Sequence, residues 1–208
     1  MNIFEHWPRI PRMASECSIT EKLDGTNASI LIVKMAAETP EFQEQCWEAL
    51  DQKRGLLIDG MAVFACSRNR HIWPGQDNHS FASWVWENAP ELVRILGEGR
   101  HFGEWWGRGI QRGYEMPYRV FSVFNTYQYA WLNDEEERER HDVIESLRCV
   151  PVLYRGIFSF EALNEAINTL SQEYEDIPVV AEGVVIHFRN NDAPFKIIIG
   201  PGGDKRSG

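Results

Sequence analysis

The chain has 208 residues, 43% hydrophobic and 25% charged, and these ordinary globular values exclude a disordered or collagen-like protein. Taken whole, the formal net charge of −10 argues against a nucleic-acid partner. Residues 134–145 and 161–176 each carry a net charge of −5, however, so the rest of the chain is neutral overall. A neutral body can still present one positive groove, and the net charge therefore excludes little.

The sequence favours a reduced cytoplasmic protein. The longest apolar run, Met61 to Cys66, is too short to span a bilayer, and the first residues hold prolines and charges where a secretory signal needs an apolar stretch. The four cysteines form no CxxC pair, which argues against disulfides and against a zinc site. His71, His79 and His101 do not lie at metal-ligand spacing, so we interpret them as structural or surface residues.

The first half of the chain mixes strands and helices. Residues 17–23 and 28–34 are predicted as two strands around an Asp24-Gly25 turn. Apolar residues at helical spacing after Pro40 predict a helix over 40–50. Residues 61–67 have the composition of a strand, and residues 81–96 predict a helix that is broken near its proline.

The predicted elements of the second half also show no regular alternation of strands and helices of the βαβ type. The segment 101–109 is rich in aromatic residues and glycine, and residues 119–124 alternate like a strand. Amphipathic acidic helices are predicted around 134–148 and 160–174, followed by short strands at 179–188 and 194–199. We therefore expect one α+β domain over residues 1–208, built on antiparallel sheet, with a mobile tail at 200–208.

One short string carries chemistry. Lys22-Leu23-Asp24-Gly25 places an amine at the end of a strand just before a turn, although alone it is equally consistent with a hairpin and a solvated lysine. Five further strings follow in order: Ser67-Arg68-Asn69-Arg70, Phe102-Gly103-Glu104, Phe121-Ser122-Val123-Phe124, Ala181-Glu182-Gly183 and Phe195-Lys196. Together they resemble the nucleotidyltransferase motifs of polynucleotide ligases and mRNA-capping enzymes.

Two strings narrow the resemblance. Glu21 to Asn27 and Phe102 to Gln111 are similar to the ATP-dependent RNA ligases of the branch that holds phage double-strand-repair and kinetoplastid editing ligases. DNA ligases usually have an arginine where Asn27 stands, which favours RNA. The resemblance implies an antiparallel-sheet nucleotidyltransferase domain that uses ATP with Mg²⁺ or Mn²⁺. It also implies a lysyl-AMP intermediate and the sealing of 5′-phosphate to 3′-hydroxyl RNA ends, a reaction of RNA repair.

The same resemblance implies roles for individual residues. Lys22 is the expected nucleophile; an amine must be unprotonated to attack the α-phosphate of ATP, and Lys196, Arg68 and the cation would supply the necessary positive field. Glu104 and Glu182 suit ribose hydroxyls and a hydrated Mg²⁺, which prefers one or two carboxylates. Phe124 is expected to face the adenine ring. The expected nucleotide-binding residues are Glu21, Asn27, Arg68, Glu104, Phe124, Glu182 and Lys196, with Glu21 reading the adenine edge through its carboxylate or its main chain.

The sequence departs from the family pattern at several places. Asn125 replaces a common aspartate, and Ile198 replaces the second lysine of the last motif, a place that Lys205 would fill from the tail. Only twelve residues follow Lys196, so we expect no C-terminal accessory domain in this chain. RNA, for instance a nicked duplex or an RNA/DNA hybrid, would then be bound by a basic face that comprises Arg68, Arg70, Arg108, Arg112 and Arg119.

Two other classes of function stay open. An adenylylation-only or GTP-using capping-like transferase would attach a nucleotide without joining strands. A nucleic-acid-binding module with an inactive site would attach none. The sequence predicts no membrane contact and leaves the oligomeric state open.

Overall fold

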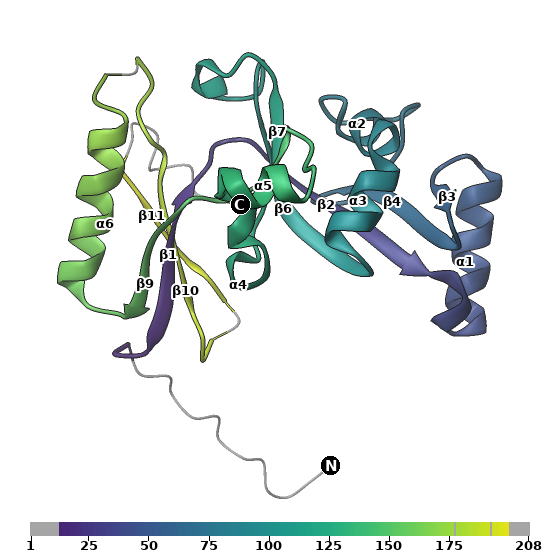
Figure 1. Cartoon of the computed structure of the whole chain (residues 1–208), viewed down its shortest axis with the longest axis horizontal. Helices are drawn as coiled ribbons and strands as arrows, with labels where there is room; N and C mark the ends of the chain where they lie inside the picture. The colour runs from purple at the N-terminus through teal and green to yellow at the C-terminus, as the bar shows by residue number, and fades with distance from the viewer. Residues whose placement is uncertain (1–12, 177, 192, 200–208) are drawn as a thin grey trace, which may run out of the picture. The chain divides into compact units, whose positions relative to one another are not determined.

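The computed structural model describes residues 13–176, 178–191 and 193–199, which form two compact units (Figure 1). The terminal unit holds the described residues up to Lys22 and those from Val152 onward, and the central unit is Leu23–Pro151. The tail expected to be mobile, with Lys205, lies outside the described residues, and the single domain over 1–208 stays a prediction. No helix in the described part of the chain is long and apolar enough to cross a membrane.

The terminal unit is a four-stranded antiparallel sheet in the order β11-β10-β1-β9, with a helix on one face. Its elements are β1 (Glu16–Lys22), β9 (Val152–Ile157), α6 (Phe160–Glu173), β10 (Gly183–Phe188) and β11 (Phe195–Ile198). The Ser159 side chain accepts a hydrogen bond from the backbone of Ala162 and so begins α6 as an N-cap. Leu163 and Leu170 of α6 pack on Ile19 and Val184 of the sheet, which makes this face the apolar core of the unit.

The central unit is built on a larger sheet in the order β3-β4-β2-β6-β7-β8. Its strands are β2 (Thr26–Lys34), β3 (Leu56–Ile58), β4 (Met61–Ser67), β5 (His71–Ile72), β6 (Gly99–Gly107), β7 (Arg119–Val123) and β8 (Leu147–Cys149). β5 pairs with β4 beside the main order, and β7 pairs with β8 in parallel while the other named strand pairs are antiparallel.

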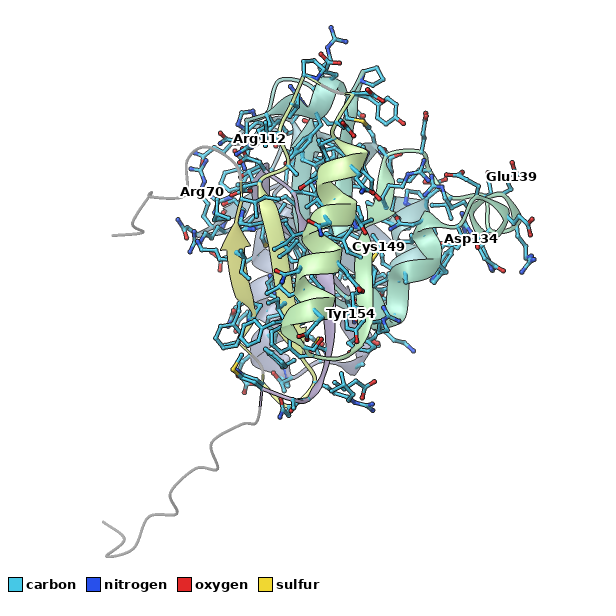
Figure 2. The ribbon with its side chains drawn as sticks, turned by 90° about the vertical axis from the view of Figure 1, so that its left-hand side faces the viewer. Arg70, Arg112, Asp134, Glu139, Cys149 and Tyr154 are labelled. Carbon is cyan, nitrogen blue, oxygen red and sulfur yellow. The ribbon has the colours of Figure 1, made fainter. Side chains whose placement is uncertain are left out.

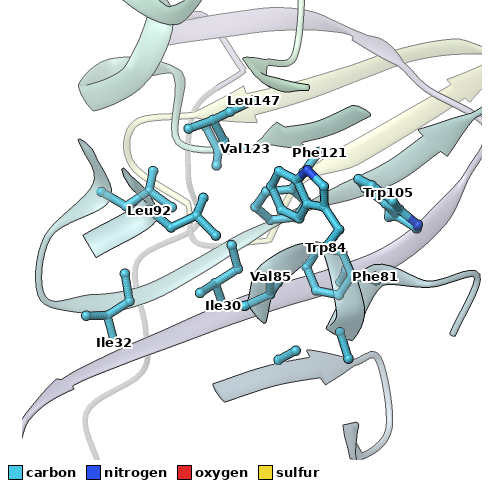
Figure 3. Close-up of a cluster of buried hydrophobic side chains, with 14 of the residues drawn as sticks. Ile30, Ile32, Phe81, Trp84, Val85, Leu92, Trp105, Phe121, Val123 and Leu147 are labelled. Carbon is cyan, nitrogen blue, oxygen red and sulfur yellow. The ribbon is translucent and has the colours of Figure 1, made fainter. Parts of the chain in front are cut away.

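One face of the central sheet is buried under α2 (Phe81–Glu87) and α3 (Ala89–Leu96). Figure 3 shows the resulting core, in which Phe81 and Trp84 of α2 meet Trp105 and Phe121 of the sheet. The ring centroids of these aromatic residues lie 5.1 to 5.9 Å apart, within the range in which aromatic pairs stabilise a core. These four aromatic residues therefore form one packed group on the side of the sheet that α2 covers.

The opposite face of the central sheet is covered at one end only. α1 (Pro40–Asp51), capped by Thr39, packs Cys46 against Val33 and Phe64 at the end of β2 and β4. At the other end of β2, Asn27 is exposed. This uncovered part, which we call the open face, is where most of the predicted site residues of the central unit lie.

Five short elements connect these parts: η1 (Met35–Ala37), η2 (Gly113–Glu115), α4 (Thr126–Tyr129), η3 (Ala130–Asn133) and α5 (Glu135–Arg140). The Asp134 side chain caps α5 at its N-terminus. The acidic side chains of α5 project to solvent at the right-hand edge of Figure 2, where Asp134 and Glu139 are labelled. Arg70 and Arg112 lie at the other edge of the same unit in that view. The negative charge of α5 is thus kept apart from these two arginines.

The α+β class with antiparallel sheets is confirmed, and so are most of the predicted elements. Two expectations are wrong. The strands predicted at 17–23 and 28–34 both form, but they belong to different sheets and do not make a hairpin. The helix predicted at 134–148 is only α5, because the chain then turns and enters β8.

Candidate active site

In the terminal unit, Lys22 and Glu182 form an ion pair. Lys22 ends β1, Glu182 immediately precedes β10, and the lysine Nζ lies 2.5 Å from the glutamate Oε2. Their side chains are only 23% and 17% exposed, so solvent weakens this pair less than it weakens one on an open surface. Within the terminal unit the two predicted groups, nucleophile and acid, are thus already in contact.

A glycine fixes the strand beside this pair. Gly183 pairs with Lys22 on one side and with Ile198 on the other. Its φ is +155°, and a Cβ at this position would lie only 1.9 Å from the carbonyl oxygen of Ile197. Only glycine allows β11 to approach β10 so closely, which explains the glycine of the Ala181-Glu182-Gly183 string.

Lys196 lies one step away along the sheet. It pairs with Val185, and Val185 pairs with Thr20 of β1. Because side chains alternate along a strand, Lys22, Thr20 and Lys196 share one face of the sheet. Lys196 is exposed, whereas Ile198 occupies the position in line with Lys22 across Gly183. A lysine at position 198, as in the family's last motif, would therefore lie in the same cross-strand row as Lys22, the expected nucleophile.

Glu21 points to the other face of the same sheet. Its carboxylate accepts a hydrogen bond of 2.6 Å from the hydroxyl of Tyr174, just after α6, and the residue is 5% exposed. Burial raises the pKa of Glu21 to about 7, the nearby Glu173 raises it slightly, and the Tyr174 hydrogen bond opposes this. The carboxyl group is thus held on the α6 face of the sheet, opposite to the face of Lys22.

In the central unit, Glu104 holds the segment that follows Lys22. One carboxylate oxygen accepts from the Gly25 backbone N–H at 3.2 Å, and the other accepts from Asn27 Nδ2 at 2.8 Å. Glu104 is only 8% exposed, so these hydrogen bonds are made in a largely desolvated place. Asn27 and Glu104 are also directly paired in the β2–β6 register, which accounts for the contact.

Neighbouring groups fix the Asp24-Gly25 stretch further. The Asp24 N–H donates to the Tyr114 hydroxyl at 2.7 Å, and its carboxylate pairs with Arg112 Nε at 2.9 Å. A Cβ on Gly25 would lie 2.5 Å from the Trp105 carbonyl oxygen, so the turn lies tightly against β6. Tyr114 was not singled out in the sequence because a lone tyrosine in a loop carries no spacing signal.

The register of the central sheet places the other predicted residues in rows on the open face. Glu104 pairs with Ser122 of β7, and the Phe124 N–H donates to the carbonyl of Phe102 in the next row. Arg68 follows the last paired residue of β4 and is exposed. Phe124 itself is partly buried and packs against the core cluster.

Asn125 occupies the position of the family's aspartate. Its side-chain oxygen accepts from the Gln128 N–H at 3.3 Å and begins α4. Because Asn and Asp are almost equivalent as N-caps, this departure leaves the local structure intact.

The arginines expected to bind RNA divide into two groups. Arg112 is paired with Asp24, and Arg119 donates to the backbone carbonyls of Arg108 and His79. Arg68, Arg70 and Arg108 are exposed, and none of their side chains forms an ion pair with another described residue. The structure therefore leaves only the second group available to phosphates.

The two carboxylates expected to bind metal belong to different units, Glu182 to the terminal and Glu104 to the central one. The described residues contain no cluster of three or more His, Cys, Asp or Glu side chains that would hold a metal alone. Glu182 Oε2 is buried and has its ion pair with Lys22 but no hydrogen bond in the described chain. A single carboxylate of this kind fits a hydrated cation that takes its other ligands from water and phosphate.

Comparison with solved structures places this fold among RNA ligases. Two variants of Naegleria gruberi RNA ligase with bound ATP and manganese align with TM-scores of 0.52 and 0.51, at 16% and 17% identity. A third variant, with AMP and manganese, aligns at 0.51 and 17% identity. Each alignment covers 89% of this chain and 50% of the other, so the chain spans about half the length of these ligases.

The sequence comparison is more specific. The family profile described as RNA ligase matches residues 15–198, which is most of the chain and includes every predicted site residue. The protein therefore belongs to the RNA ligase family. A search of curated proteins finds no match.

Proposed function

We propose that the protein is an ATP-dependent RNA ligase that works through a lysyl-AMP intermediate on Lys22. The observation that carries the proposal is the Lys22–Glu182 pair at the end of β1, inside a chain that matches the RNA ligase profile. The lysine nitrogen forms a bond to the α-phosphorus of ATP while the bond to pyrophosphate breaks, and the amine loses its proton. An RNA 5′-phosphate then takes the AMP, and a 3′-hydroxyl displaces AMP to form the phosphodiester.

The ion pair has to open before the first step. An ammonium has no lone pair for attack, and a carboxylate at 2.5 Å stabilises the charged amine. If the Glu182 carboxylate bound a cation instead, the Lys22 amine would lose its negative partner and would have a positive charge nearby. Lys196, on the same face of the terminal sheet, would add to that positive field.

The central unit is proposed to bind the rest of the nucleotide. Asn27 and Glu104 would hold the ribose, Phe124 would face the adenine, and Arg68 would contact phosphate. The fixed hydrogen bonds of Glu104 support this role, because a pre-organised acceptor loses little freedom when the ligand binds. The main chain at Glu21 would read the adenine edge.

The cation is proposed to be Mg²⁺ or Mn²⁺. The related Naegleria ligase structures contain manganese with ATP or AMP. Glu182 and Glu104 are the residues that would hold it, with water and phosphate oxygens as its other ligands. The bound cation would neutralise the phosphate charge that builds in the transition state.

Mass spectrometry tests the first step directly. Incubation of the intact protein with ATP and Mn²⁺ should add the mass of one AMP, and Lys22→Ala should abolish the adduct. Lys34→Ala is the matched control, because Lys34 ends β2 as Lys22 ends β1 and is exposed. Undiminished labelling of Lys22→Ala would overturn the assignment.

Nucleotide and substrate choice separate the alternatives. Labelling by GTP rather than ATP would favour a capping-like transferase, and no adduct with either would favour an inactive binding module. We further propose that the substrate is RNA with a 5′-phosphate and a 3′-hydroxyl, as a nicked duplex or an RNA/DNA hybrid, in cytoplasmic repair. Joining assays on single-stranded RNA, nicked duplex RNA and the RNA/DNA hybrid would show which substrate is joined fastest.

A further inference from the structure

Phe102 is an exposed aromatic residue in the interior of the central sheet. Its strand, β6, pairs with β2 on one side and β7 on the other, yet Phe102 is 59% exposed. His101 and Gly103, before and after it, are buried. Because side chains alternate along a strand, Phe102 lies on the open face together with Glu104 and Arg100.

Short neighbours explain why the ring stays uncovered. In its row across the sheet Phe102 pairs with Ser29, and Ser29 pairs with Cys66. Neither a serine nor a cysteine side chain is long enough to shield a phenyl ring, and α1 covers only the Phe64 end of this face. An aromatic ring exposed to water at the centre of a sheet lacks the free energy that burial would give. Such an exposed ring indicates a surface that binds a ligand or partner.

The charge around Phe102 indicates a polyanion. Arg100 lies two residues before it, roughly 7 Å along the strand. Arg68 and Arg70 follow β4, which lies on the far side of β2 from the strand of Phe102. All three arginines are exposed, and none forms an ion pair with another described residue. Arg100 Nη1 donates to the Sγ of Cys66 at 3.6 Å, which leaves its positive charge without a negative partner. A flat aromatic ring beside cations that no ion pair neutralises is the combination by which proteins bind single-stranded nucleic acid.

Phe102 is distinct from the residue expected to face the ATP adenine. That residue, Phe124, is partly buried and packs against the core cluster, whereas Phe102 is in no core cluster of the described chain. Phe124 directly follows Val123, which pairs with Gly103, so Phe124 is the neighbour of Phe102 in the same row on the β7 side. The two rings are therefore distinguished by their burial and not by their row. A second aromatic surface is therefore present on the open face, beyond the residues assigned to the nucleotide.

We propose that Phe102 is the platform on which a nucleobase at the RNA end stacks, and that Arg100 contacts a phosphate beside it. This inference rests on the proposed ligase function but concerns RNA binding rather than attachment of AMP. Stacking of one base on an aromatic side chain is worth about 1–3 kcal/mol, which corresponds to about 5- to 150-fold in affinity. The ring positions the RNA and takes no part in bond making.

Separate assays of the two steps test the proposal. With RNA that already carries the 5′-AMP, Phe102→Ala should raise the KM for RNA by about 5- to 150-fold with little change in kcat. Phe102→Trp should stay close to the wild type, because it keeps an aromatic face. The yield and rate of the Lys22 adduct should be unchanged in both variants. Trp47→Ala is the control, because Trp47 is also an exposed aromatic residue but lies on α1.

A binding measurement keeps the proposal independent of catalysis. Fluorescence anisotropy with a short single-stranded RNA should show the same loss for Phe102→Ala, and Arg100→Ala should lower the salt dependence by about one phosphate contact. Unchanged RNA affinity in Phe102→Ala would overturn the proposal, and an equal loss of adduct formation would place the ring in the ATP site instead. A wild type that binds RNA through Phe102 but forms no adduct would refute the proposed ligase and leave this inference standing.

Discussion

The two units hold their predicted acids in opposite ways. In the terminal unit, Glu182 Oε2 is in contact with Lys22 and forms no hydrogen bond in the described chain. In the central unit, both oxygens of Glu104 accept hydrogen bonds, from Gly25 and Asn27. One carboxylate is held by the charge of a lysine, and the other by two hydrogen-bond donors.

This difference would suit the two tasks of the covalent nucleotidyl transfer that we propose. A reacting lysine needs a partner that can leave, because its amine must lose a proton and form a bond. A binding surface gains from a partner that stays, because fixed geometry lowers the entropy cost of holding the substrate. The following substitutions break this contrast, beginning with the largest expected effect.

Gly183→Ala should disrupt the terminal unit. The new Cβ would lie 1.9 Å from the Ile197 carbonyl oxygen, so β10 and β11 could not keep their pairing. We expect a loss of about 4 kcal/mol or more in unfolding free energy, together with loss of the AMP adduct. Urea unfolding measures the first effect, and mass spectrometry measures the second.

Gly60→Ala in the central unit is the matched control. Gly60 has φ +79°, but a Cβ there would meet no atom within 4 Å. Only the cost of a left-handed alanine applies, about 1 kcal/mol. Equal losses in the two variants would show that backbone conformation, and not the contact with Ile197, decides the effect.

The buried carboxyl of Glu21 should make stability depend on pH. Its pKa is raised from 4.5 to about 7 by burial, so the folded state binds the proton more tightly than the unfolded chain does. The stability gained from the protonated group is complete below pH 4.5 and is lost as pH rises through about 7, with a total of about 3 kcal/mol.

Urea midpoints measured from pH 5 to pH 8 would follow this loss. Glu21→Gln should flatten the profile, because the amide has no proton to lose in this range. Tyr174→Phe removes the hydrogen bond that favours the charged carboxylate, so the loss of stability should continue to higher pH in this variant than in the wild type. An unchanged slope in Glu21→Gln would assign the pH dependence to another group.

Glu182→Gln and Glu104→Gln should separate the two kinds of carboxylate. At Glu182 the lost charge removes both the partner of Lys22 and the proposed cation ligand, so adduct formation should fall about 100-fold. At Glu104 one oxygen remains as an acceptor while the new amide faces a donor, so a fall of about 10-fold is expected. Single-turnover rates at saturating Mn²⁺ would measure both, and a near wild-type rate would remove that acid from the site.

Salt should affect strand joining more than attachment of AMP. If Arg68, Arg70 and Arg100 neutralise two or three phosphates, joining should weaken by about 10-fold between 50 and 200 mM salt. Attachment of AMP needs only ATP and a cation and should change little. Equal salt dependence of the two reactions would contradict RNA binding through these arginines.

Local patterns predicted most of the elements but not how the strands combine. The apolar spacing after Pro40 predicted α1, and alternation predicted β7, because both signals depend only on neighbours in sequence. The hairpin over 17–34 was wrong because β1 pairs with β9 and β10, more than 130 residues away. At Asp24-Gly25 the N–H groups bond to Tyr114 and Glu104 rather than closing a turn.

The helix predicted at 134–148 was too long for a similar reason. Arg138 is buried and donates to the carbonyls of Leu132, Ile144 and Leu147. These bonds hold the chain in a turn after only 6 residues of helix. A charged residue in an acidic run gives no sign in the sequence that it will be buried. The acids around it do form a solvated face, as the sequence indicated.

The candidate site was predicted through the resemblance, residue by residue. The resemblance selected Lys22, Glu182, Asn27 and Glu104, but the contacts of Lys22 with Glu182 and of Asn27 with Glu104 were not predicted and come from the structure. Tyr174 and Phe102 were missed as functional candidates, because a buried hydroxyl partner and an exposed ring are properties of the folded surface. The burial of the Glu21 carboxyl could have been inferred from alternation with Lys22, which assigns the two side chains to opposite faces.

The strand order of the terminal unit also determines when its strands can pair during synthesis. β1 is made first, but its partners β9 and β10 begin only at Val152 and Gly183. The central unit, whose strands all lie between, can form while the ribosome is still adding the remainder. At 5–20 residues per second, β1 waits roughly 8 to 30 s for its neighbours. During that time Lys22 has no Glu182 beside it, so the Lys22–Glu182 pair can form only after the whole central unit has been synthesised.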